Sequence, residues 1–162
     1  MAVTNTEIMG WYLAPIAQAF SEIAPTFPKS RITPLDDYAW YPLSDCLRAL
    51  HDLASEATLN IANLGMRTAQ YLAIPHWIDN IPAALITLED IYRRAHRNNH
   101  YGELSARIFA AHHVRCTVNT PYPEDFMYGL ISGVAMRYIP SGGHFEVRRS
   151  YTDRATIVDV KW

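Results

Sequence analysis

The chain has 162 residues and a net charge of -2, with 49% hydrophobic and 19% charged residues. That length suffices for one domain with a proper core, and the composition excludes disorder over most of the chain. The charge balance offers no basic surface for nucleic acid, and no apolar run approaches the roughly 20 residues of a membrane span. Two cysteines, Cys46 and Cys116, and a start without a signal-peptide pattern indicate a cytoplasmic protein in a reducing compartment.

Helical spacing dominates the first two thirds of the chain. Thr4 and Glu7 have capping-box spacing ahead of an apolar series from Ile8 to Ile23, with a kink expected at Pro15. Further helices are expected over 43–53, 61–72 and 81–95, and a shorter one from Tyr101 to about Ala111.

The helix expected over 81–95 carries two further signals. Pro82 suits its first turn. Glu89 and Asp90 each stand four residues before an arginine, Arg93 and Arg94, which is the spacing of favourable ion pairs. The basic run that contains these arginines lies at the helix end, where cations complement the helix dipole.

The tail of the chain changes character. A strand is expected at His113–Val118, a helix from Glu124 to Tyr138, and two closing strands at Phe145–Tyr151 and Thr156–Trp162. The sequence therefore predicts a single α+β domain over 1–162, helical over about 1–112 with a β-containing tail over about 113–162. We expect N-terminal helices packed on a small antiparallel sheet, with a strand-helix-strand-strand tail.

The tail helix contains the run Phe-Met-Tyr-Gly-Leu-Ile-Ser-Gly-Val over 126–134, in which Gly129 and Gly133 lie four residues apart. With its preceding strand and closing hairpin, it resembles the 4-vinyl reductase-like domains, which are similar to modules associated with haem-NO-binding domains and to a vesicle-tethering subunit. The resemblance covers the C-terminal half, including the 81–92 helix. It implies a ligand-binding or interaction module of signalling proteins, frequently a homodimer. The metal-binding cysteines and histidine proposed for that family have no counterparts in the final hairpin, so no metal is expected.

A ligand pocket is expected between the 81–92 helix, the 126–138 helix and the tail sheet. Rings beside prolines and glycines can bound a cavity. Glycines also let a ligand or another backbone approach closely, and tight helix-on-sheet packing is the alternative explanation for them. The residues expected to line the pocket are Trp77, Tyr92, Tyr122, Phe126, Tyr128, Gly129 and Gly133.

The histidines make haem the cofactor to consider. His76 follows Pro75 in an apolar neighbourhood and is the best candidate for an axial ligand. The haem-NO-binding domains combine such a histidine with a Tyr-x-Ser-x-Arg clamp, which does not occur in this sequence, so we expect no cofactor and a colourless protein. His96 and His100 have the spacing of a shared helical face but are expected at a solvated helix end.

The sequence favours binding over catalysis, because nucleophile elbows and Gly-rich phosphate loops are missing. The leading interpretation is a small-molecule-sensing or regulatory binding domain of a signalling system, dimeric through Trp11, Tyr12 and Phe20 of the first helix unless that helix covers the tail sheet. One alternative is a protein-interaction module without a ligand. The other is a small enzyme acting on an apolar substrate, which would need titratable groups to converge, with His76, His112 and Arg137 the first to consider.

Overall fold

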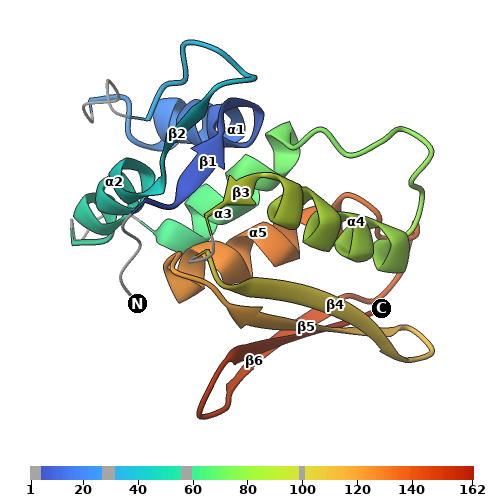
Figure 1. Cartoon of the computed structure of the whole chain (residues 1–162). Helices are drawn as coiled ribbons and strands as arrows, with labels where there is room; N and C mark the ends of the chain where they lie inside the picture. Colours follow the sequence, from blue (N-terminus) through green and yellow to red (C-terminus); the bar gives the residue numbers. More distant parts are fainter. Residues whose placement is uncertain (1–4, 27–31, 56–59, 99–100) are drawn as a thin grey trace.

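The computed structural model describes residues 5–26, 32–55, 60–98 and 101–162 (Figure 1). Within these ranges the predicted α+β class is confirmed. In chain order the elements are β1 Glu7–Met9, α1 Gly10–Ile23, β2 Trp40–Pro42, α2 Leu43–Ser55, α3 Ile61–Tyr71, α4 Ile81–Arg94, β3 His96–Arg97, β4 Glu103–Ala110, β5 His113–Asn119, α5 Glu124–Met136, β6 Glu146–Tyr151 and β7 Thr156–Lys161.

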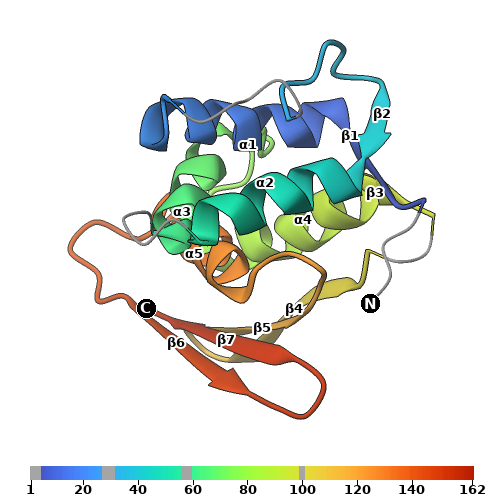
Figure 2. The same ribbon diagram turned by 90° about the vertical axis from the view of Figure 1, so that its left-hand side faces the viewer.

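The elements form layers: α1 lies farthest from the main sheet, α4 and α5 pack on the sheet, and α3 lies between α1 and α5 (Figures 1 and 2). The main sheet is antiparallel with strand order β4-β5-β7-β6, and a small antiparallel sheet has the order β2-β1-β3. The predicted strand-helix-strand-strand tail is confirmed as β5, α5, β6 and β7. No described helix is long and apolar enough to cross a membrane.

The expected helix from Tyr101 to about Ala111 is wrong, because strand β4 lies there. Leu104 pairs with Val118 and Ala106 with Cys116 of β5. Leu104 and Ala106 are almost fully buried, at 4% and 2% exposure. Cross-strand pairing and burial decide this segment, whose local pattern was compatible with a helix.

The first helix also differs from the expectation. It begins at Gly10, Ile8 lies in β1, and Thr4 of the expected cap lies outside the described residues. Pro15 is inside α1, and Tyr12 and Phe20 are fully buried. These two rings belong to the core and are therefore not available as dimer anchors.

The helix α1 packs on α3 and does not cover the tail sheet. The strand β1 pairs with β2 on one side and with β3, directly after α4, on the other. The Met9 N–H donates to the Ala95 carbonyl at 2.8 Å. The N-terminal elements are thus bonded to the chain at the end of α4.

The helix α5 is buried on nearly every side, between the main sheet and α3. Its two glycines face α3, so the predicted helix-on-sheet role for them was wrong. A Cβ on Gly129 would collide with the backbone of Ala62, and one on Gly133 would lie 2.7 Å from the Ala69 Cβ. Gly65 of α3 faces the α5 backbone in the same way. Small residues on both helices permit this close crossing.

Candidate functional site

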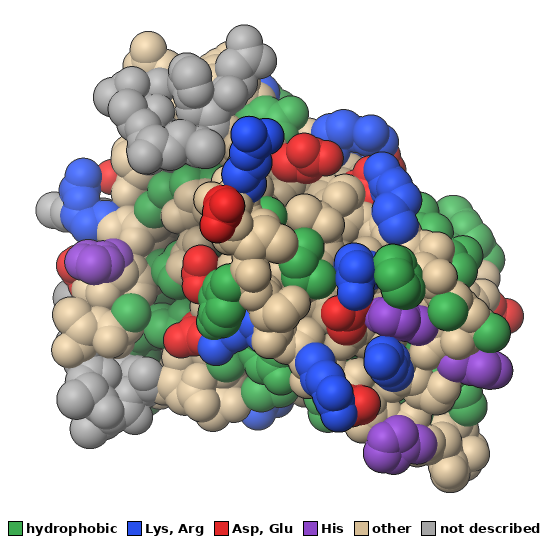
Figure 3. Space-filling view, turned by 90° about the horizontal axis from the view of Figure 1, so that it is seen from below, with side chains coloured by type: hydrophobic (Ala, Val, Ile, Leu, Met, Phe, Trp, Pro, Cys, Tyr) green, Lys and Arg blue, Asp and Glu red, His purple; other side chains and the backbone are tan. Residues whose placement is uncertain are grey.

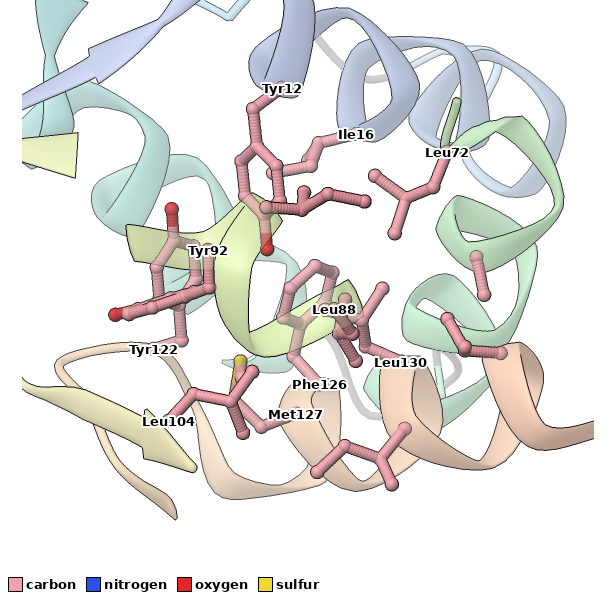
Figure 4. Packing of buried hydrophobic residues seen from close by; sticks show 14 of the residues in the cluster. Tyr12, Ile16, Leu72, Leu88, Tyr92, Leu104, Tyr122, Phe126, Met127 and Leu130 are labelled. Atoms are coloured by element: carbon pink, nitrogen blue, oxygen red, sulfur yellow. The ribbon is translucent and has the colours of Figure 1, made fainter. Parts of the chain in front are cut away.

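Aromatic side chains from α1, α4, α5 and two loops meet in the interior, between the N-terminal elements and the pair α4 and α5 (Figure 4). Adjacent ring centroids lie 4.4 to 6.4 Å apart, which is ring-to-ring contact. We call this group the ring cluster; its members are Tyr12, Tyr92, His96, Tyr101, Tyr122 and Phe126.

Local sequence positions each ring. The Asn80 side chain caps α4 by accepting from the Ala83 N–H at 2.9 Å, Tyr92 lies in the last turn of that helix, and His96 follows in β3. Tyr122 lies between two prolines in the loop from β5 to α5, where both pyrrolidine rings restrict the backbone. Phe126 follows in the first turn of α5 and stacks on Tyr122 at 5.6 Å.

The imidazole of His96 is the polar centre of the ring cluster. Nδ1 lies 2.7 Å from the Tyr92 carbonyl oxygen and Nε2 lies 2.7 Å from the Tyr122 hydroxyl. A carbonyl can only accept, so Nδ1 carries the proton and Nε2 accepts from Tyr122. Burial lowers the pKa of His96 to about 4, so the ring is neutral at neutral pH.

The hydroxyl of Tyr12 points into the same region (Figure 4). Tyr12 is fully buried, its ring centroid lies 5.3 Å from that of His96, and its hydroxyl has no hydrogen-bond partner among the described residues. Burial raises the pKa of this phenol above its usual value, so it remains a neutral donor. An unpaired buried hydroxyl is costly, and a bound molecule could accept from it.

The structure brings together three of the residues predicted to line a pocket, Tyr92, Tyr122 and Phe126. Tyr12 of α1 and His96 of β3 join these three rings, and residues of the tail strands also lie beside Tyr122. The predicted solvated helix end is wrong for His96, which is 4% exposed, and His100 lies outside the described residues.

The other predicted lining residues lie elsewhere. Trp77 is 70% exposed on the connection from α3 to α4. Tyr128 lies between α5 and β6, where its hydroxyl donates to the Val147 carbonyl at 3.4 Å and Arg149 covers its ring. The space beside Gly129 and Gly133 is filled by α3. Sequence reasoning did not assign Tyr12 and His96 to the site, since Tyr12 was expected in a dimer contact and His96 at a solvated helix end.

The groups considered for an enzyme lie on separate elements. His76 and His112 lie on two different turns, away from the ring cluster. The guanidinium of Arg137 donates to the Ala69 and Leu72 carbonyls at 2.8 and 3.0 Å, which satisfies the end of α3. Within the described ranges, no group of three or more His, Cys, Asp or Glu side chains could hold a metal ion.

Comparison of structures identifies the fold. A single-substitution variant of Tt H-NOX matches with a TM-score of 0.65 and 14% identity, over 95% of this chain and 94% of that one. An H-NOX protein from S. oneidensis in its Fe(II)NO state matches with a TM-score of 0.62 and 12% identity, over 95% and 98%. An oxygen-binding H-NOX domain related to soluble guanylate cyclases matches at 0.55 and 14%, over 94% and 91%. The chain therefore has the H-NOX fold, while no family model and no curated protein matches its sequence.

These matches correct two expectations. The likeness extends over 94–95% of the chain and not only its C-terminal half, and the 4-vinyl reductase-like label is not confirmed. The expectation of no cofactor is overturned, because structures with this fold are haem proteins, one of them studied for its haem redox potential and porphyrin distortion.

The residues of the ring cluster fit a haem in their chemistry. A neutral imidazole whose Nδ1–H is held by a backbone carbonyl presents Nε2 as a metal ligand, and the surrounding rings are apolar walls. The unpaired Tyr12 hydroxyl adds a donor. In this arrangement the rings touch one another and Nε2 accepts from Tyr122, so a macrocycle enters only if the rings separate. His76, the histidine favoured by the sequence, is exposed on a turn and has no ring contact with the cluster within the described residues.

Proposed function

We propose that this chain is a small-molecule-sensing domain of a signalling system whose ligand site is the ring cluster, and that the ligand is haem. One observation carries the proposal: a neutral, carbonyl-oriented His96 and an unpaired Tyr12 hydroxyl lie together inside the H-NOX fold. The iron of a bound haem would supply a coordination position for a diatomic gas. The residues of the chain would supply the imidazole, a hydroxyl donor and exclusion of water.

Haem binding would require the ring cluster to rearrange, and this rearrangement would carry the signal. To free Nε2, Tyr122 must give up its hydrogen bond to His96, which costs about 0.5–1.5 kcal/mol. Tyr12 must also move away from Tyr92 and His96, and Tyr12 belongs to α1, whose neighbour β1 is paired to β3. A ligand in the ring cluster would therefore shift the N-terminal elements relative to α4 and α5.

Haemin titration followed by absorption spectroscopy tests the proposal. We expect a saturable Soret band at one haem per chain, lost in His96→Ala because the iron loses its ligand. The controls are His51→Ala, at an exposed position of α2, and His76→Ala, and both should keep the band. Tyr122→Phe should tighten haem binding, because Nε2 is then free.

A titration without a saturable band would contradict the haem proposal and favour the second candidate, an interaction module. The closed packing of the ring cluster supports that alternative, since rings in mutual contact already form a complete core. A band that persists in His96→Ala would place the iron elsewhere.

We also propose that the domain is a cytoplasmic homodimer. Its two cysteines, Cys46 and Cys116, are free and buried, which suits a reducing compartment. The sequence expectation of a dimer rested on aromatic content and low charge, and exposed apolar side chains are available for a contact even though Tyr12 and Phe20 are not.

A further inference from the structure

The strand β4 forms one edge of the main sheet, and the first half of that edge is covered. The Glu89 carboxylate on α4 accepts from the Ala106 backbone N–H at 2.9 Å and from Arg107 Nη1 at 2.7 Å. A carboxylate on an edge N–H blocks strand addition at that point. The predicted partner of Glu89, Arg93, pairs instead with Asp90 at 2.8 Å.

Beyond Arg107, the side of β4 that faces the core becomes exposed to solvent. Side chains alternate along a strand, so Leu104, Ala106 and Ile108 point to one side. The first two are 4% and 2% exposed, whereas Ile108 is 64% exposed. The sheet therefore presents an inward-facing apolar residue that nothing in the chain covers within the described residues.

A second exposed apolar side chain lies across a groove from Ile108. Ile86 on α4 is 44% exposed, and the two isoleucines border a groove of about 470 Å³. The remaining lining residues are Glu89, Asp90, Arg93, Ala106 and Arg107. The groove thus has an apolar centre and charges of both signs around it.

The outer face of the main sheet is different in character. Viewed from below, it shows Lys, Arg and His side chains with acidic and hydrophobic side chains among them (Figure 3). Side chains of neighbouring strands are hydrogen-bonded at its centre: Asp159 accepts from Arg115 at 2.8 Å and lies 2.7 Å from His113 Nε2. The exposed ring of Phe109 on this face is covered by the Arg115 guanidinium, 4.0 Å from its centroid, whereas the isoleucines of the α4–β4 groove have no such cover among the described residues.

We propose that the α4–β4 groove is the surface through which two copies of this chain pair about a twofold axis, with Ile86 and Ile108 at its centre. This inference rests on the homodimer proposed above and is independent of haem. The charges identify the occupant as a second copy. A twofold contact brings a patch against itself, so the patch must hold both signs.

The α4–β4 groove meets that requirement. Arg93 and Arg107 are 65% and 69% exposed in their side chains and Asp90 is 43% exposed. A strongly acidic or basic partner would meet like charges here, whereas a second copy can place each sign opposite the other. The net charge of -2 per chain gives little long-range repulsion between copies.

Sedimentation equilibrium tests the inference on the full chain. We expect a wild-type dimer whose dissociation constant rises about 100-fold or more in Ile86→Glu/Ile108→Glu, because two desolvated charges would face their own copies. The matched control is Met136→Glu, which places the same charge on a 53% exposed residue of α5 and should leave the dimer intact. Circular dichroism confirms folding, and Ile86→Ser/Ile108→Ser replaces the glutamates if they unfold the chain.

Charge reversal gives a second readout. Asp90→Lys and Arg93→Glu should each weaken self-association, and the mixture of the two should form a heterodimer. A monomeric wild type would overturn both the dimer and its contact, and a folded, dimeric isoleucine double variant would overturn the contact alone. Neither result bears on haemin titration, so the two proposals fail separately.

Discussion

At the residue scale, two buried polar groups of the ring cluster differ in how they are satisfied. Both nitrogens of His96 have partners, whereas the Tyr12 hydroxyl has none among the described residues. We therefore expect Tyr12→Phe to raise the free energy of unfolding of ligand-free protein by about 1 kcal/mol, because it removes a buried unpaired group. Chemical denaturation with a two-state fit measures the change.

The control for this variant is Tyr92→Phe. The Tyr92 hydroxyl donates to the Tyr101 carbonyl, so its removal should cost about 1 kcal/mol. If Tyr12→Phe also destabilises the protein, the Tyr12 hydroxyl has a partner in solution, such as an ordered water.

Three members of the ring cluster were among the residues singled out from the sequence. Tyr92, Tyr122 and Phe126 were expected to line a pocket because rings beside prolines and glycines can bound a cavity. His96 was missed because the helical pattern ends near it, and an imidazole at a helix end is normally solvated. Its burial comes from the pairing of β3 with β1, a contact between residues far apart in sequence that no local pattern reveals.

At the element scale, α5 shows how closely two helices can cross. The position of Gly129 leaves no room for a methyl group, since a Cβ would collide with the Ala62 carbonyl of α3. Alanine gains about 1 kcal/mol over glycine in helix propensity, but overpacking against backbone costs about 1–3 kcal/mol or more. We expect Gly129→Ala to lower the free energy of unfolding on balance.

Ser132→Ala is the matched substitution on the same helix. The Ser132 hydroxyl is buried without a partner among the described residues, so its loss should leave the stability unchanged or slightly higher. Denaturant midpoints of the two variants decide the matter. Equal midpoints would mean that α3 and α5 are farther apart in solution.

Most helices and strands could be located from the sequence. The predicted type was wrong where pairing with a distant strand overrides the local pattern. Pro82 and the acids at 124 and 125 mark the starts of α4 and α5. The segment 103–110 became a strand because β5 pairs along it, with apolar pairs such as Leu104 opposite Val118 on the side that faces the core. The role of the glycines was recognised as close packing, but their neighbour α3 could not be inferred without the crossing geometry.

At the scale of the whole molecule, the likeness to H-NOX domains lies in the arrangement of elements, since sequence identity is only 11–14%. The order of elements in the tail could be predicted because it depends on local patterns, whereas the family resemblance drawn from it was not confirmed. The N-terminal elements join it through β1, β3 and the ring cluster, all of which are long-range contacts. His96 lies at that junction, so its protonation acts on the stability of the whole fold.

The stability of the folded chain should therefore depend on pH through His96. Its pKa is lowered to about 4 by burial, from 6.5 in an exposed state, so between these values the unfolded chain binds a proton that the folded chain does not. The stabilisation is fully present above pH 6.5 and is lost as the pH falls toward 4, by about 3 kcal/mol in total.

Urea denaturation at a series of pH values should show this slope in wild type and in the control His51→Gln, and a flatter profile in His96→Gln. Carboxylates with lowered pKa, such as Asp159, lose their contribution at still lower pH and do so equally in all three proteins. Identical profiles for His96→Gln and wild type would show that His96 is hydrated in solution and that the N-terminal elements already stand open over the ring cluster.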